Sequence, residues 1–167
     1  KEVCDDGLDN DCDGTANNCR LVGDFTMNSD ADVYLDGSNT SDYAGQAVSN
    51  LGDWDGDGYD EVIVAAPFYD DGAEADVGAV YVLNGNETSS LDLDSDAIAV
   101  IVGEDSNDYA GWGLDGGGDF DGDGTEDILI GAFNGETATS NTNSGMVYLF
   151  QGDVAGTNSI ASADISF

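Results

Sequence analysis

The chain has 167 residues, with 36 Asp and Glu against two Lys and Arg and no His, so its formal net charge is −34. This charge excludes nucleic-acid binding through a basic patch and electrostatic docking on anionic lipid, because both require clustered Lys and Arg. The lack of His in the sequence excludes imidazole catalysis and His-based zinc sites.

The composition favours an all-β fold. Hydrophobic residues make up 40% of the chain, and the 24 Gly and many Asp separate short Val, Ile and Leu runs with no long helical period. The longest apolar run, Ala97–Val102, is too short to span a bilayer. The chain begins with Lys1 and not Met, so we interpret it as a mature or trimmed product.

The first 22 residues form a Cys- and Asp-rich region, which we separate from a second region at 23–167. Three Cys is an odd number, so a disulfide, most simply Cys4–Cys12, leaves Cys19 unpaired or bonded to another chain. Such clustering suits an oxidising compartment and predicts a secreted, extracellular or cell-surface protein. The alternative is a thiolate metal site, although three Cys without His make a poor zinc set.

An internal repeat organises the second region. Tyr43-Ala44-Gly45 returns as Tyr109-Ala110-Gly111, and Asp53–Gly58 returns as Asp119–Gly124, in each case 66 residues later. A third repeat opens near residue 162.

Each repeat predicts four strands, which is typical of a four-stranded antiparallel β-propeller blade. About two and a half repeats then make an incomplete propeller, and a two-sheet sandwich is the alternative. The apolar runs Val62–Ala66 and Ile128–Ala132 show no alternation, so we expect strands buried on both faces. The predicted strands are Gln46–Leu51, Glu61–Ala66, Ala79–Leu83 and Ala97–Val102, then Trp112–Gly116, Asp127–Ala132, Met146–Phe150 and Ala163–Phe167.

An Asp-rich loop lies between the first two predicted strands of each repeat, at 53–61 and 119–127. Residues 1, 3, 5, 7 and 9 of such a loop can point five oxygens at one cation, and Ca²⁺ fits this oxygen set better than Mg²⁺. The alternative is a solvated acidic turn. An EF-hand is excluded because Val64 and Ile130 stand where its twelfth-position acid is required. The predicted ligands are Asp53, Asp55, Asp57, the Tyr59 carbonyl and Glu61, and then Asp119, Asp121, Asp123, the Thr125 carbonyl and Asp127.

The N-terminal region has a third loop of the same spacing. Its candidate ligands are Asp9, Asp11, Asp13, the Thr15 carbonyl and Asn17. It lacks the flanking strands, so a disulfide-held acidic loop without an ion is the alternative.

These motifs resemble the FG-GAP repeat, the blade of integrin α-subunit propellers and of many bacterial surface proteins. The resemblance covers about residues 30–167 and implies Ca²⁺ held in the loops on one propeller face. Tyr-Ala-Gly stands where that family usually has Phe-Gly, and Phe133 replaces the Pro67 of the first copy. The segment Glu2–Gly14 looks like a Cys/Asp metal-binding motif of secreted bacterial proteins.

Three functions are consistent with this sequence. The first is a non-catalytic, calcium-binding extracellular adhesion or interaction module, with a protein or glycan partner at the cell surface. The second is a self-assembling fibre subunit, in which the last strand, Ala163–Phe167, pairs with another chain and builds a filament. The third is the non-catalytic propeller part of a carbohydrate-active enzyme.

Other side chains are assigned to the scaffold. The remaining acids are expected to be solvated surface, and the aromatic residues near turns are expected to pack between blades. The acids are Asp70, Asp71, Glu74, Asp76, Glu104 and Asp108, and the aromatic residues are Tyr34, Tyr43, Trp54, Tyr59, Tyr109 and Trp112.

Overall fold

The computed structural model describes residues 33–37, 39–87, 89–136, 143–152 and 154–166. They all lie in the second of the two units into which the chain divides, Asp32–Phe167. The predicted disulfide and the third loop, at Cys4, Cys12, Cys19, Asp9, Asp11, Asp13, Thr15 and Asn17, lie outside the described residues.

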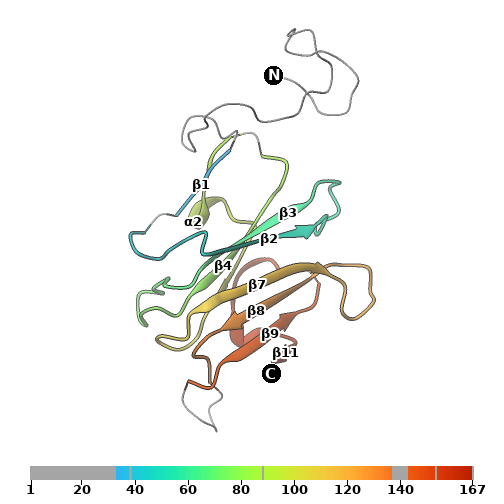
Figure 1. Cartoon of the computed structure of the whole chain (residues 1–167). Helices are drawn as coiled ribbons and strands as arrows, with labels where there is room; N and C mark the ends of the chain where they lie inside the picture. The colour runs from blue at the N-terminus through green and yellow to red at the C-terminus, as the bar shows by residue number, and fades with distance from the viewer. Residues whose placement is uncertain (1–32, 38, 88, 137–142, 153, 167) are drawn as a thin grey trace, which may run out of the picture. The chain divides into compact units, whose positions relative to one another are not determined.

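The first repeat forms an antiparallel blade in the strand order β2-β3-β4-β6. Figure 1 labels β2, β3 and β4 of this blade. A fifth strand, β10, joins the free edge of β6. The bounds are β2 Ala47–Gly52, β3 Glu61–Ala66, β4 Ala79–Leu83, β6 Ala99–Val102 and β10 Gly156–Ser159.

The second repeat forms an antiparallel sheet in the order β11-β9-β8-β7. The bounds are β7 Ala110–Gly118, β8 Asp127–Ala132, β9 Met146–Phe150 and β11 Ile165–Ser166. The predicted four-stranded, all-β blades are therefore confirmed, and the residues of β3, β4, β8 and β9 are those predicted.

Short elements that the sequence did not predict join one repeat to the next. β10 comes from the second repeat but pairs in parallel with β6 of the first, from Gly156 opposite Ala99 to Ser159 opposite Val102. β1 (Leu35–Asp36) and β5 (Leu91–Asp92) form an equivalent parallel pair. β5 is followed by helix α2 (Leu93–Asp96) and β10 by a 3₁₀ turn, η1 (Ile160–Ser162). These segments are short and mostly polar, so they show no hydrophobic period.

Within the described residues, no helix is long and apolar enough to cross a membrane. The helical segments found there, α2 and η1, are four and three residues long.

The main hydrophobic core lies between the two blades. It receives one face of the first blade, including Leu51, Ile63 and Val82, and one face of the second, including Ile128 and Ile130. All five are at most 1% exposed. Burying large aliphatic side chains contributes roughly 1.5–3 kcal/mol each, so this layer supplies much of the stability. A smaller cluster around Tyr81 and Leu93 covers the other face of the first blade.

At one end of this core the blades approach so closely that only small residues fit. A Cβ on Gly78 would stand 2.2 Å from the backbone oxygen of Ala110, and a Cβ on Gly111 would stand 2.8 Å from the Ala65 Cβ. The N–H groups of Tyr109 and Ala110 donate to the carbonyls of Asp76 and Val77 at 3.2 and 3.0 Å. The repeated Tyr-Ala-Gly motif is therefore the corner by which the second blade docks on the first.

The outer face of the second blade is more open than the sequence predicted. β3 is buried on both faces as expected, apart from a partly exposed Val62, but Leu129 and Gly131 in β8 are partly exposed. The expectation of two buried faces is therefore wrong for β8. The physical reason is that no further sheet of the described residues covers this side.

We expect Gly78→Ala to destabilise the fold more than Gly72→Ala. Both glycines have positive φ, +84° and +90°, so each substitution costs roughly 1–2 kcal/mol of backbone strain. Only at Gly78 does the new Cβ also meet the Ala110 backbone, whereas at Gly72 it meets nothing within 4 Å. Overpacking adds about 1–3 kcal/mol.

Urea unfolding of the two variants measures the difference. Equal losses in the two variants would show that the blades do not rely on this close approach.

Candidate metal centre

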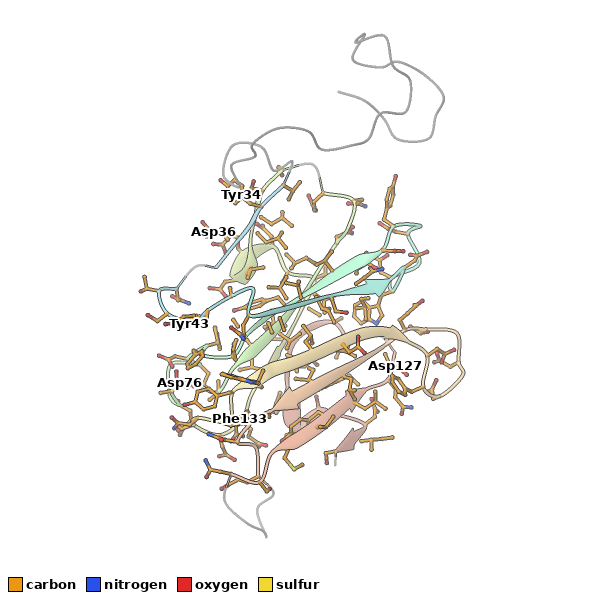
Figure 2. All side chains as sticks on the ribbon, in the orientation of Figure 1. Tyr34, Asp36, Tyr43, Asp76, Asp127 and Phe133 are labelled. Carbon is orange, nitrogen blue, oxygen red and sulfur yellow. The ribbon has the colours of Figure 1, made fainter. Side chains whose placement is uncertain are left out.

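The two acidic loops occupy equivalent places in the two blades. Residues 53–60 connect β2 to β3, and residues 119–126 connect β7 to β8. Tyr43 precedes β2 and Phe133 follows β8, so these aromatic residues lie at the opposite end of the strands from the loops. Figure 2 shows Asp127 on the loop side and Tyr43 and Phe133 on the other.

In the first loop the structure brings three predicted ligands together. Carboxylate oxygens of Asp53, Asp55 and Asp57 lie within 4.8 Å of one another, and all three side chains are exposed. Backbone N–H groups hold them in place: Gly58 donates to Asp53 at 3.1 Å, and Tyr59 donates to Asp57 at 2.9 Å. Gly58 has φ +95°, which lets the loop turn back on itself.

In the second loop the cluster has a different membership. It consists of Asp119, Asp121 and Asp127, again within 4.8 Å, and does not include Asp123. The Asp123 carboxylate accepts the N–H of Thr125 at 2.8 Å, as Asp57 accepts that of Tyr59 in the first loop. The N–H of Gly124 donates to Asp119 at 3.0 Å, matching Gly58 and Asp53 in the first loop. The acid at position 9 of the loop is therefore part of the cluster in the second loop, where it is Asp127, but not in the first, where it is Glu61.

Each ninth-position acid is buried at the start of a strand. Glu61 begins β3 and is 0% exposed, and Asp127 begins β8 and is 1% exposed. One oxygen of each acid accepts a backbone N–H from position 2 of its own loop. Trp54 donates to Glu61 at 2.8 Å, and Phe120 donates to Asp127 at 2.6 Å. A buried charged group is costly unless it is paired, so these positions are unusual for acidic residues.

The two buried acids differ in their remaining oxygen. Asp127 Oδ1 accepts the N–H of Gly152 at 2.9 Å. Glu61 Oε1 is buried and has no hydrogen-bond partner. Because an unpaired buried carboxylate oxygen carries a full desolvation penalty, it needs a cation or a donor. The first loop thus has three converging carboxylates and one buried acceptor that a hard dication can satisfy.

A chain of hydrogen bonds connects the two loops. The indole Nε1 of Trp54, in the first loop, donates to the carbonyl of Gly152 at 3.3 Å, and the N–H of Gly152 donates to Asp127. Trp54 is buried. The blades are therefore joined at the loop end by a polar contact, as they are joined at the other end by the Tyr-Ala-Gly corner.

The six aromatic residues near turns differ in burial, and the rings of Tyr43 and Trp112 lie 5.0 and 6.1 Å from the ring of Phe68. The packing prediction is right for Trp54, but Tyr34, Tyr43, Tyr59 and Trp112 are exposed. Tyr109 is partly exposed, and its ring centroid lies 5.1 Å from that of Phe68.

A pair of buried aspartates precedes the repeated Tyr-Ala-Gly motif. Asp42 and Asp108 are 9% and 6% exposed, so the prediction that Asp108 is solvated surface is wrong. Burial, followed by the neighbouring charge of Asp105, raises the pKa of Asp108 to about 6. Burial also raises the pKa of Asp42. The sequence signal was present, because Asp occupies this position in both repeats.

Comparison with known proteins identifies the repeats. The family model described as FG-GAP repeat matches residues 44–83 and 110–150. Integrin alpha-5 of Xenopus laevis is 34% identical over 121 residues, which cover 70% of this chain and 11% of that protein. Integrin alpha-V of Gallus gallus is 35% identical over 98 residues, covering 56% and 9%.

An enzyme also contains a similar segment. The phosphatidylinositol-glycan-specific phospholipase D of Dictyostelium discoideum is 31% identical over 131 residues, covering 70% of this chain and 13% of that protein. The chain therefore spans roughly a tenth of the length of these relatives.

We expect Trp54→Phe to destabilise the fold by about 1–2 kcal/mol, because the buried Gly152 carbonyl loses its indole donor. Phe is compatible with the loop, since Phe120 occupies the same position in the second repeat. Guanidinium unfolding measures the loss, and Phe120→Tyr at an exposed site is the control. A variant as stable as the parent would show that the contact is dispensable.

Asp108 predicts a pH effect. Its pKa is about 6 in the folded protein and about 3.9 in the unfolded chain, so the folded state binds the proton more tightly. The free energy of unfolding should therefore fall as the pH rises from about 4 to 6.

In the Asp108→Asn variant, the free energy of unfolding should fall less steeply between about pH 4 and 6 than in the parent. In Asp115→Asn, at an exposed residue, the slope should match that of the parent. Thermal melts in a chelator test this without competition from metal binding. An unchanged slope in Asp108→Asn would contradict it.

Proposed function

Since the chain contains two FG-GAP repeats of the kind found in integrin α subunits, we propose that it is a calcium-stabilised, non-catalytic module for adhesion outside the cell. The observation that supports calcium most directly is Glu61. Its Oε1 is buried without a partner at the end of the loop that holds three converging carboxylates, and no Lys or Arg of the described residues is present to neutralise them.

In this proposal each loop holds one Ca²⁺. The first ion is held by Asp53, Asp55, Asp57, the Tyr59 carbonyl and Glu61, and the second by Asp119, Asp121, Asp123, the Thr125 carbonyl and Asp127. Calcium accepts six to eight oxygens in flexible geometry, which suits a loop of carboxylates and one carbonyl. Glu61 lies outside the cluster of the first loop and Asp123 outside that of the second, so binding would require both carboxylates to approach the ion.

Calcium would act here as a structural ligand. The ion would supply the positive charge that the described residues lack, and would fix the ends of β2 and β3 and of β7 and β8. A ligand that binds only the folded state stabilises it by about 2.7 kcal/mol at a hundredfold excess over its dissociation constant. Two independent loops would therefore contribute a large fraction of the stability of a small domain.

The partner is a protein or glycan at the cell surface. Integrin names among the relatives support an adhesive role, and we propose a secreted or surface location with a disulfide in the N-terminal region. Residues 1–22, with Asp9, Asp11, Asp13, Thr15 and Asn17, would form a separate motif that holds a third ion. The resemblance of this segment to secreted bacterial proteins supports a bacterial source.

Two alternatives retain specific support. The phospholipase D relative is consistent with the repeats forming a non-catalytic part of a larger enzyme. Strand pairing in a fibre is supported by β11, which lies at the edge of its sheet with Ile165 39% exposed. The equivalent strand of the first blade, β6, has its edge covered by β10.

The calcium proposal predicts a defined loss of one ion in Glu61→Gln. The substitution keeps the size of the side chain but removes the charge that faces the cation. Asp60→Asn is the control, because it removes the same charge at the neighbouring exposed residue, which is outside the predicted ligand set.

Calcium per chain is measured by elemental analysis after dialysis and by titration calorimetry. Glu61→Gln should bind one ion fewer than the parent, and a chelator should lower the melting temperature of the parent and of Asp60→Asn. A parent protein that binds no calcium, or melts identically in chelator, would refute the proposal.

A further inference from the structure

The strongest unassigned feature is a contact between the first acidic loop and the turn that follows β4. The side-chain amide of Asn86 donates to Oδ2 of Asp57 at 2.8 Å, across 29 residues of sequence. Asp57 is one of the three carboxylates that converge in this loop. The amide thus reaches a predicted calcium ligand from outside the loop.

The turn that carries Asn86 is held against the loop by its backbone. Oδ1 of Asn84 accepts the N–H of Asn86 at 3.0 Å, which fixes the turn. A Cβ on Gly85 would stand 1.8 Å from the carbonyl oxygen of Asp60, so only glycine permits this close approach. The backbone at Asn86 is therefore fixed relative to the loop, and its amide needs little further ordering to reach Asp57.

The amide completes the hydrogen bonding of the Asp57 carboxylate. Oδ1 accepts the N–H of Tyr59 at 2.9 Å, and Oδ2 accepts the amide of Asn86. Donors on both oxygens fix the orientation of the carboxylate, and each oxygen keeps a lone pair for a cation. They also offset part of the repulsion from Asp53 and Asp55 in the same cluster. Asn86 therefore holds this carboxylate in the cluster before any ion binds.

The second loop shows the arrangement without such a donor. Asp123 accepts the N–H of Thr125 at 2.8 Å, as Asp57 accepts that of Tyr59. Among the described residues, however, no side-chain amide donates to Asp123, and its carboxylate lies outside the cluster of its loop. The two loops share the backbone contact and differ in the amide, which indicates that Asn86 keeps Asp57 in its cluster.

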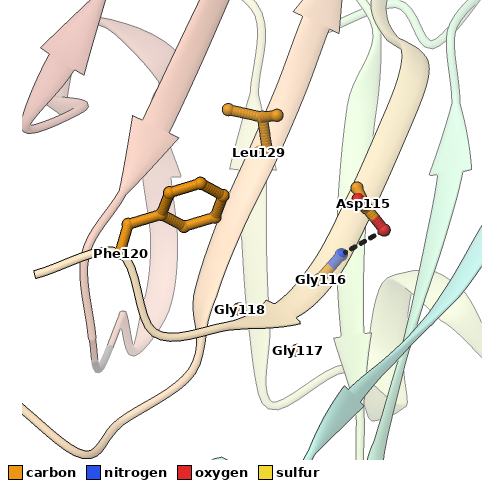
Figure 3. A pocket seen from close by; sticks show the side chains of 6 residues that line it. All are labelled: Asp115, Gly116, Gly117, Gly118, Phe120 and Leu129. Carbon is orange, nitrogen blue, oxygen red and sulfur yellow. Dashed lines mark hydrogen bonds between the residues drawn. The ribbon is translucent and has the colours of Figure 1, made fainter. Parts of the chain in front are cut away.

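The contact does not depend on what adjoins the second blade. Phe120, in the second loop, lies beside Leu129 and Gly118 on a side that no sheet of the described residues covers (Figure 3). Its exposure of 63% therefore depends on what packs there in a longer chain. The distance between Asn86 and Asp57 is instead set by strand connections within the first blade.

We propose that Asn86 is a positioning residue for calcium in the first loop. By holding Asp57 beside Asp53 and Asp55, it lowers the cost of assembling the ligands, so the ion binds more tightly. Outer partners that orient metal ligands typically contribute about 10- to 100-fold in metal affinity. The inference rests on the proposed function, because it concerns the same ion, and it assigns part of the affinity to a residue outside the loop.

Variants of the full chain test the proposal. Asn86→Ala removes the amide at an exposed position. Asn39→Ala is the matched control, because the exposed Asn39 amide donates to the exposed Asp94 carboxylate at 3.4 Å, and neither residue is a predicted ligand. Each is also combined with Asp121→Ala, which removes a ligand of the second loop, so that calcium titration calorimetry reports the first loop. Melting temperatures are measured in calcium and in chelator.

In the Asp121→Ala background, Asn86→Ala should bind calcium at least about tenfold more weakly, and Asn39→Ala should bind it unchanged. In an Asp55→Ala background, where the second loop is intact, Asn86→Ala should leave the calcium affinity unchanged. Asn86→Ala alone should melt at a lower temperature than the parent in calcium, but at the same temperature in chelator.

Equal calcium affinities of Asn86→Ala and Asn39→Ala would overturn the inference and leave the proposed function intact. A melting temperature of Asn86→Ala that falls as much in chelator as in calcium would also overturn it, since the amide would then support the fold and not the ion. A parent chain that binds no calcium would refute the proposed function itself, and this inference with it.

Discussion

The structure depends on how closely the two blades approach at small residues. Gly78 and Ala110, with Gly111 and Ala65, bring backbone against backbone, and no larger side chain fits between them. This close approach sets β7 against β2, β3 and β4, and lets Ile63, Val82, Ile128 and Ile130 form one core. Packing at near-crystalline density makes such an interface sensitive to a single added methyl group.

The loop end of the same interface is organised by charge. Glu61 and Asp127 are acidic residues that begin buried strands, and each holds its own loop by accepting a backbone N–H. Trp54 and Gly152 extend this network from one blade to the other. A buried network of this kind stabilises the fold only when its members are satisfied. The unpaired oxygen of Glu61 is therefore the point at which a bound cation would complete the structure.

The two ends of the blades differ in chemistry, and this separates their roles. One end carries converging carboxylates, and the other carries Tyr43, Phe68, Tyr109, Trp112 and Phe133, whose rings form a continuous series of contacts. A stabilising ion at the first end would leave the second available for contacts with other molecules.

The sequence by itself determined the repeat, the four strands of each blade and the acidic loops. The 66-residue spacing and the apolar runs were enough to place β3, β4, β8 and β9, because strand formation there follows from local pattern and is supported twice. Only the tertiary structure decided which residues are buried. Leu129 follows the pattern of Ile63 yet is partly exposed, and Phe120 follows Trp54 yet is exposed, because burial depends on whether another sheet lies opposite.

The tertiary structure also decided the pairing of β10 with β6, which joins a polar segment to an apolar strand more than 50 residues away. It likewise distinguished Asp127, with both oxygens bonded, from Glu61, with one unpaired. The physical reason is the same in each case. Spacing along the chain sets which groups recur, but contacts between distant segments set which of these groups are desolvated and which find a partner.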